Sequence, residues 1–279
     1  MNRLSTEKRA QIVGCLVEGM SIRATVRATG AAKNTISKLL LDLGNACSEY
    51  QDRTLRNLTS KRIQCDEIWA FVGAKQKNVR PDHPHDYGDV WTWVAIDADT
   101  KLVPTWLVGE RQAIDAYAFM QDLAGRLNHR IQLTTDGNRA YLEAVTDAFG
   151  PGIDYAILQK IYGTPPSARD AARRYSPSEC IGVQIEPIYG DPDPDHVSTS
   201  YVERQNLTMR MGMRRFTRLT NAFSKKVEHL AQAVSLHFMY YNFARPHKTL
   251  SKPYPTTPAM AAGVADHVWT LPEIAALLD

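Results

Sequence analysis

The sequence contains no apolar run of 18 residues or more, so it predicts no membrane-spanning helix. Its opening residues, MNRLSTEKRAQIV, lack the apolar core that a signal peptide needs, and we therefore expect a cytoplasmic protein with no membrane partner. Cysteine is scarce: the chain has four, at positions 15, 47, 65 and 180, with no C-x-x-C pair. This spacing predicts neither a zinc ribbon nor a disulfide framework, and buried, reduced thiols are the expected state.

Charge, by contrast, is plentiful and unevenly distributed along the 279 residues, although the net charge is only +3. Residues 1–62 carry 11 Lys/Arg against 5 Asp/Glu, and residues 201–252 carry 10 against 2, while the rest of the chain carries 12 against 23. Basic segments favour a polyanionic partner, because neutralising phosphates releases counterions. An acidic centre favours divalent cations. Any one segment could be a solvated surface, but the combination indicates nucleic acid and metal together.

The first 45 residues are predicted to form an all-α helix-turn-helix domain. Helical periodicity covers residues 6–18, 21–29 and 32–43, and Gly30 permits the turn before the third helix. The apolar positions of that helix fall on one face. Its other face offers short polar and basic side chains to a DNA major groove, namely Lys33, Asn34, Thr35, Ser37 and Lys38. The alternative is a plain helical bundle without a DNA-binding role.

The pattern changes at Ile63, after a polar and basic stretch (46–62) that we interpret as a linker. Strands are predicted at 63–72, 90–96 and 102–108, followed by a helix at 113–127, a strand at 130–135 and a helix at 139–148. This order fits an α/β ribonuclease-H-like core, a mixed five-stranded sheet flanked by helices. We assign the catalytic domain to 63–250, with 162–200 unassigned and helices in pieces over 199–243. A C-terminal tail at 251–279 contains a short helix at 271–278.

Three carboxylates fall at informative places in this pattern. Asp66 lies inside the first predicted strand, Asp136 directly after the fourth, and Glu203 on a later helix. In a ribonuclease-H-like core these positions can converge, and three carboxylates can hold two Mg²⁺ or Mn²⁺ ions that act on a phosphodiester. Asp66 is costly to bury without such a partner. Taken alone, Asp136 could instead start a turn, and Glu203 could be an exposed member of an ion pair.

Four segments carry recognisable motifs: CDEIWAFVGAK (65–75), GER (109–111), TTDGNRAY (134–141) and SYVERQNLTMRMGMRRFTRLTNAFSKKVEH (200–229). They resemble the DDE/D transposases of small bacterial insertion sequences, most closely the family of the shortest elements, over roughly residues 63–245. The resemblance implies that Asp66, Asp136 and Glu203 are the catalytic carboxylates. It also implies a basic residue seven positions after the Glu. Arg210 occupies that position, on the same helix face, from which it could contact a DNA phosphate.

The activity that this resemblance implies is transposition. The protein would use Mg²⁺ or Mn²⁺, two ions in all, to cleave transposon ends and join the freed 3′-hydroxyl to target DNA. It would act on double-stranded DNA as a homodimer or larger assembly, on the nucleoid of a bacterial cytoplasm. Two alternatives stay open: a ribonuclease-H-like nuclease that cuts without joining, and a DNA-binding repressor with an inactive core.

Several other polar residues are predicted to lie outside the set of metal ligands. Glu67 adjoins Asp66, but successive strand residues face opposite sides, so we exclude it from the metal set. Asp97 is assigned to a hairpin turn. A basic cluster after the catalytic helix is predicted to contact DNA phosphates, the alternative being a solvated face; its members are Arg214, Arg215, Arg218, Lys225 and Lys226. Roles are left open for His83, His85, His229 and His237.

Overall fold

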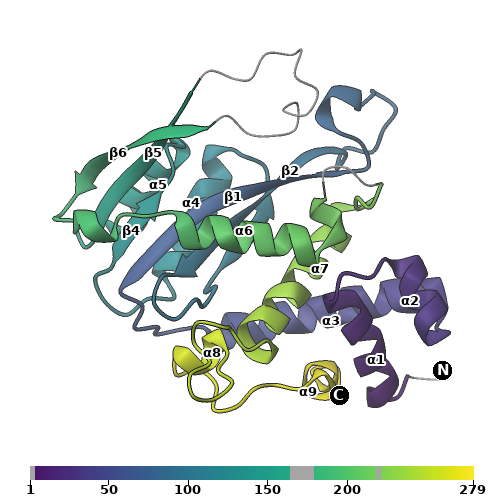
Figure 1. Ribbon diagram of the computed structural model, residues 1–279. Helices are drawn as coiled ribbons and strands as arrows, with labels where there is room; N and C mark the ends of the chain where they lie inside the picture. Colours follow the sequence, from purple (N-terminus) through teal and green to yellow (C-terminus); the bar gives the residue numbers. More distant parts are fainter. Residues whose placement is uncertain (1–3, 164–178, 218–220) are drawn as a thin grey trace.

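The computed structural model describes residues 4–163, 179–217 and 221–279, and a six-stranded mixed sheet lies at its centre (Figure 1). The strand order is β3-β2-β1-β4-β5-β6. β1, β4 and β5 run parallel, while β2, β3 and β6 each pair antiparallel with a neighbour. The strands span Arg62–Val72 (β1), Gly88–Asp97 (β2), Trp106–Gly109 (β3), Gln132–Thr135 (β4), Asp154–Tyr162 (β5) and Cys180–Tyr189 (β6). The mixed sheet with β1 beside β4 is consistent with the predicted ribonuclease-H-like core.

Three strands differ from the prediction. β5 lies at Asp154–Tyr162, where no strand was predicted. The predicted five-stranded sheet is wrong by one strand, because β6 forms within the segment that was left unassigned. β3 begins at Trp106 rather than at Leu102. Pro104 has no N–H for a ladder, and the backbone of Val103 bonds the side chain of Asn242 instead, through its N–H (3.0 Å) and its carbonyl (3.0 Å).

Helices cover both faces of the sheet (Figure 1). On one face α4 (Ala113–Ala124) and α5 (Ala140–Phe149) pack over Cys65 and Trp93. On the other face α6 (Ser200–Gly212) and α7 (Val227–Met239) pack over Ile68 and Val94. Odd and even residues of β1 therefore enter different cores, as the two-residue period of a strand requires. None of the helices in the described part of the chain is long and apolar enough to cross a membrane.

Three helices precede the sheet: α1 (Thr6–Val17), α2 (Ile22–Thr29) and α3 (Lys33–Thr54). Gly30 ends α2 in the left-handed conformation (φ 71°), which glycine adopts without a steric penalty. α3 runs on to Thr54 rather than ending near Leu43, because its later turns pack against α7. A Cβ on Gly44 would lie 2.6 Å from the carbonyl oxygen of Gln232, so only glycine allows this approach. The division into domains at 45 and 62, and the helix-turn-helix role, remain predictions.

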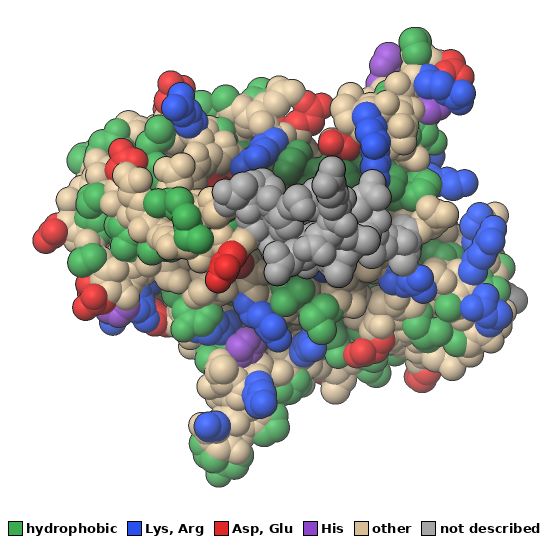
Figure 2. All heavy atoms as spheres, turned by 45° about the horizontal axis from the view of Figure 1, so that its top comes forward, with side chains coloured by type: hydrophobic (Ala, Val, Ile, Leu, Met, Phe, Trp, Pro, Cys, Tyr) green, Lys and Arg blue, Asp and Glu red, His purple; other side chains and the backbone are tan. Residues whose placement is uncertain are grey.

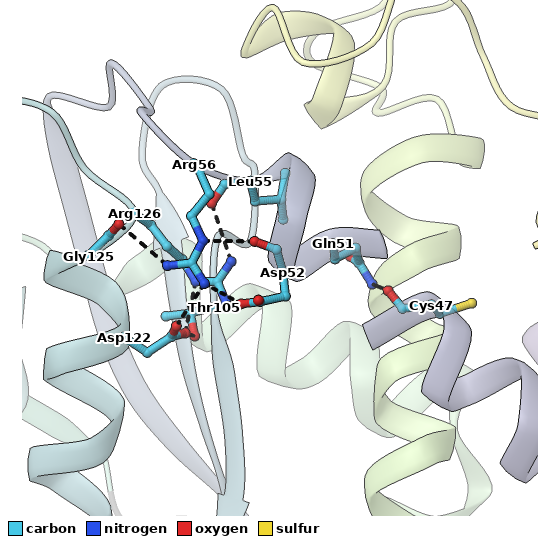
Figure 3. A network of polar contacts seen from close by, with 9 residues as sticks. All are labelled: Cys47, Gln51, Asp52, Leu55, Arg56, Thr105, Asp122, Gly125 and Arg126. Atoms are coloured by element: carbon cyan, nitrogen blue, oxygen red, sulfur yellow. Dashed lines mark hydrogen bonds and ion pairs between the residues drawn. The ribbon is translucent and has the colours of Figure 1, made fainter. Parts of the chain in front are cut away.

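The end of α3 is attached to the sheet region by a buried arginine (Figure 3). The guanidinium of Arg126 contacts Asp52 of α3 (2.8 Å) and Asp122 of α4 (2.8 Å), and also donates to the carbonyl of Leu55 (3.3 Å). Asp122 in turn accepts a hydrogen bond from Thr105. Charge-assisted bonds of this kind are stronger than neutral ones, so this junction has a defined geometry.

The C-terminal residues return to the first helices, as the purple and yellow ends of the chain show in Figure 1. α9 (Leu271–Ala276) packs against α1, and Ile274 joins the core that α3 and α7 share. The short α8 (Pro258–Ala261) lies against residues 240–244, which follow α7. The predicted tail is therefore packed on the helical half of the molecule.

Candidate metal centre

Three separate elements bring the predicted carboxylates to one cleft of about 920 Å³. β1 and β4 are paired so that Cys65 lies opposite Thr135, and Asp66 and Asp136 are therefore the next residues along the two strands. Glu203 lies in the first turn of α6. All three predicted acidic residues line this cleft, as does Arg210.

A buried glutamine positions the helix that carries Glu203. Gln64 lies two residues before Asp66, so its side chain points to the same face of β1. Its Oε1 accepts hydrogen bonds from the backbone N–H groups of Tyr201 (2.8 Å) and Val202 (3.3 Å). These N–H groups belong to the first turn of α6 and have no partner within the helix. Gln64 was not predicted, although a glutamine inside an apolar strand is a signal of such a contact.

Among the described residues, Asp66, Glu67 and Asp136 form a close acidic group: each offers an oxygen, and these oxygens lie within 4.8 Å of one another. The geometric reason for excluding Glu67 from the metal set is therefore wrong. The alternation behind it is real, because Asp66 Oδ2 accepts from Asn206 of α6 (2.9 Å) whereas Glu67 Oε1 accepts from Asn138 beside α5 (3.3 Å). Asp136, however, follows the last residue of β4. A side chain at a strand end is reached from both faces of the sheet, so opposite faces do not separate Glu67 from Asp136.

Crowding of negative charge shifts the proton affinity of this group. Burial, together with the charges of Asp136 and Glu67, raises the pKa of Asp66 to about 7. Burial and the charge of Asp136 also raise the pKa of Glu67. Arg111 supplies part of the missing positive charge: its Nε lies 3.1 Å from Glu67 and its Nη2 lies 3.7 Å from Asp136. Its guanidinium also lies over the ring of Trp91, 4.9 Å from the centroid.

The donor set fits a hard divalent cation. All its members are carboxylates, and oxygen ligands are those that Mg²⁺ and Mn²⁺ prefer. Burial, and after it the charges of Asp136 and Glu67, raise the pKa of Asp66, and a bound cation would stabilise its ionised form. Arg111 was missed as a site residue, although it ends the GER segment.

Glu203 is held apart from this group. It does not belong to the acidic cluster found among the described residues. Both of its oxygens lie 2.5 Å from Nζ of Lys160, which projects from β5, and Oε1 also accepts from Thr199 Oγ1 (2.6 Å). Lys160 lines the same cleft. It too was missed, although a lysine among the apolar residues of YAILQKIY is a signal for a buried anionic partner.

The residues predicted to bind DNA lie in two places. On α3 the predicted groove-facing side chains are exposed except for Ser37, which is half-buried, and Lys38 pairs with Asp42 (2.7 Å). After α6, Arg214, Lys225 and Lys226 are exposed. Groups of Lys and Arg side chains are spread across the face shown in Figure 2.

Two members of the basic cluster differ from the exposed ones. Arg215 is half-buried and donates to Ser224 Oγ (2.6 Å), and burial lowers its pKa to about 10. It therefore has a structural partner already. Arg218 lies outside the described residues.

The remaining polar residues have simpler environments. Asp97 caps its turn through Oδ1, which accepts from the N–H groups of Asp99 (2.7 Å) and Thr100 (3.1 Å), in accord with its predicted role. His83 bonds Arg80 in a surface loop, and burial lowers the pKa of His237 to about 4. His85 is exposed and His229 is half-buried.

The cysteines are reduced, as predicted, but they are not all buried. Cys47 and Cys65 are buried and Cys15 is half-buried, whereas Cys180 is exposed on β6. The prediction of a buried thiol is therefore wrong for Cys180, because β6 is an edge strand with solvent on both faces.

No protein-family model and no curated protein matches this chain. Among solved structures, one similar chain comes from a cryo-EM structure of the piggyBac transposase synaptic complex with hairpin DNA (TM-score 0.45, 9% identity, covering 99% of this chain and 71% of that one). A Mos1 transposase paired-end complex with left transposon end is also similar (TM-score 0.20, 15% identity), with 53% of this chain covering 58% of that one. The Mos1 strand transfer complex gives a TM-score of 0.24 at 15% identity, covering 86% and 79%. Similarities this low do not define a family, and the assignment of the site rests on the distances and charges described above.

Proposed function

We propose that the protein is a DDE-type transposase that cleaves transposon-end DNA and joins the freed 3′-hydroxyl to target DNA. One observation carries the proposal: Asp66, Asp136 and Glu203, from the central strand, the end of its parallel neighbour and a covering helix, line a single cleft. An acidic cluster at a sheet edge, flanked by basic surfaces, suits phosphoryl transfer on a polyanion.

The roles follow from the contacts. Asp66, Asp136 and Glu203 would hold two Mg²⁺ or Mn²⁺ ions, and Glu67 adds a fourth oxygen donor at the same place. When bound, these ions activate a water or a 3′-hydroxyl and stabilise the leaving oxygen. Asn206 (2.9 Å) and the N–H of Glu67 (2.8 Å) each donate to one oxygen of Asp66, and so fix the plane of its carboxylate. Arg210 would contact a phosphate of the DNA beside Glu203.

Besides the cleft, two surfaces outside it would bind DNA. The exposed face at the start of α3 would enter a major groove, with Lys33, Asn34 and Thr35 nearest the helix start. Arg214, Lys225 and Lys226 would contact phosphates and add affinity without sequence preference. Because two transposon ends must be handled together, the working form would be a dimer or a larger assembly.

The test is an assay of cleavage and joining on the terminal repeats that flank the gene, in Mg²⁺ and in EDTA. Wild type is expected to give metal-dependent nicks and strand-transfer products. Asp136→Asn is expected to lower cleavage at least about a hundredfold, since even partners of metal ligands affect activity by 10–100-fold, and to leave DNA binding largely intact. Cleavage by Asp136→Asn at the wild-type rate would show that the assigned triad is wrong.

The same assay separates the two alternatives. Nicks without joined products would identify a nuclease of the same fold. DNA binding without nicks, in wild type and Asp136→Asn alike, would identify a repressor with an inactive core.

A further inference from the structure

The ion pair between Lys160 and Glu203 conflicts with a metal-binding role for Glu203. The ammonium of Lys160 lies 2.5 Å from both carboxylate oxygens, and Thr199 donates to one of them as well. The lone pairs that a cation would use are therefore engaged. Glu203 also stands outside the cluster formed by Asp66, Glu67 and Asp136. For Glu203 to join those residues around a metal, this ion pair has to open.

The ion pair is weak enough to open. The side chains of Lys160 and Glu203 keep 29% and 39% of their surface exposed, and ion pairs at this exposure contribute little net stability. Burial alone would lower the pKa of Lys160, but the hydrogen bond and charge of Glu203 outweigh it and leave the pKa raised. Lys160 is thus a cation at neutral pH, on the wall of the cleft that would receive DNA.

We propose that Lys160 exchanges partners: it pairs with Glu203 in the DNA-free protein, and it moves to a phosphate of the substrate DNA when Glu203 turns to the metal. The inference rests on the proposed function and deepens it, since it describes how the same site is regulated. Lys160 is a positioning residue here, because it acts through Glu203 and the phosphate. In the DNA-free protein it keeps the third carboxylate out of the metal site, and so limits cleavage to the assembled complex.

The exchange couples metal binding to DNA binding. Each ligand favours the state in which the ion pair is open, so each raises the affinity of the other by the same factor. The coupling should depend on Lys160. Because each phosphate contact by a cation steepens the logarithmic salt dependence of DNA affinity by about 0.9, the contact that Lys160 adds can be counted.

The experiment measures DNA affinity by fluorescence anisotropy against salt concentration. It uses the full chain, a 30-base-pair labelled duplex, and either EDTA or Mn²⁺, with readings taken in the cold before nicked products appear on a gel. Lys160→Met is compared with wild type in each condition, so that effects of Mn²⁺ on the duplex itself cancel. We expect equal slopes in EDTA, and in Mn²⁺ a slope shallower by about 0.9 for Lys160→Met. Affinity in Mn²⁺ should fall by about fivefold.

Two further variants test the same exchange. Lys160→Arg keeps the charge and is expected to restore the wild-type slope in Mn²⁺. Lys61→Met removes an exposed lysine directly before β1 and outside the cleft. It is expected to leave the slopes in EDTA and in Mn²⁺ equal to those of wild type. Thermal unfolding of each variant shows whether it is folded, and Lys160→Gln takes the place of Lys160→Met in the comparison if Lys160→Met is not.

Three outcomes overturn the exchange. If Lys160→Met lowers the slope equally in EDTA and Mn²⁺, Lys160 contacts DNA whether or not metal is present. If it lowers neither slope, Lys160 does not contact DNA. If wild type binds no DNA at all, the proposed function fails together with the exchange. If wild type cleaves DNA but Lys160→Met has the same slopes as wild type, the exchange fails and the proposed function stands.

Discussion

The clustered carboxylates of the cleft (Asp66, Glu67 and Asp136) and Glu203 of α6 lie in opposite electrostatic states. These carboxylates lie close together, and burial, together with the charges of Asp136 and Glu67, raises the pKa of Asp66 to about 7. Glu203 is neutralised by Lys160 at 2.5 Å. A bound metal would therefore stabilise the ionised form of the clustered carboxylates. Glu203, in contrast, must lose its ion pair with Lys160 before it can bind a metal. Removing a charge should stabilise the metal-free protein at one end of the cleft and not at the other.

The largest expected effect is that of Asp66→Asn, which should separate activity from stability. Cleavage is expected to fall at least about a hundredfold through loss of a metal ligand. In EDTA at pH 8 the free energy of unfolding should rise by up to a few kcal/mol, because a carboxylate with a raised pKa destabilises the fold when ionised. Denaturant titration measures this change. If Asp66→Asn is less stable than wild type in EDTA, the ionised carboxylate of Asp66 does not destabilise the metal-free fold, which would contradict this interpretation.

Glu203→Gln provides the matched contrast at the other end of the cleft. Cleavage should again fall by about a hundredfold or more. Stability in EDTA should change little, with a loss of at most about 1 kcal/mol, because the amide only loses an ion pair that is partly exposed. The same titrations test this. If Glu203→Gln gains as much stability in EDTA as Asp66→Asn, then Glu203 and the clustered carboxylates do not differ in electrostatic state.

The pH dependence of the free energy of unfolding should reflect the raised pKa of Asp66. The pKa of Asp66 is raised in the folded protein from 3.8 to about 7, so between these values the folded state binds more protons than the unfolded state. The stability contributed by this group is full below pH 4 and is lost as the pH rises towards 7. The difference between wild type and Asp66→Asn, measured at pH 5, 6 and 8 in EDTA, should follow that course. Saturating Mn²⁺ should abolish it; a difference that does not vary with pH would show that Asp66 ionises normally.

Replacement of Arg111 should have the smallest effect. Arg111→Met removes the cation that lies beside Glu67 and Asp136 and keeps an apolar side chain against Trp91. Because that cation is 41% exposed, we expect a loss of about 1 kcal/mol in EDTA and a few-fold gain in Mn²⁺ affinity. Titration of Mn²⁺ followed by electron paramagnetic resonance measures the latter. Unchanged Mn²⁺ affinity would place Arg111 outside the electrostatics of the centre.

Much of the sheet could be predicted, because β1 and β2 are long and apolar and β2 ends at a recognisable turn at Asp97. Asp136 could be placed because it directly follows a short apolar strand. β6 could not be predicted, since it is exposed on both faces and so carries no burial pattern that its sequence would need to show. β3 was predicted too long because the competition of Asn242 for the backbone of Val103 acts over a sequence separation of 139 residues.

The carboxylates could be identified from the sequence, but their partners could not. The inclusion of Glu67 depends on β4 ending at Thr135, which alternation within β1 does not show. The engagement of Glu203 by Lys160 depends on the first turn of α6 coming within reach of a side chain of β5, a contact between residues 43 positions apart. A motif identifies the carboxylates, whereas the cations that neutralise them are brought beside them only by the fold.

Anomalous scattering from Mn²⁺ in crystals tests whether Asp66 and Asp136 hold a divalent cation that Glu203 joins on DNA binding. Without DNA, we expect a peak bonded to Asp66 and Asp136, with Glu203 still on Lys160. With a DNA duplex bound, we expect Glu203 among the ligands. No peak at Asp66 and Asp136 in either crystal, or a peak held by other residues, would contradict this assignment.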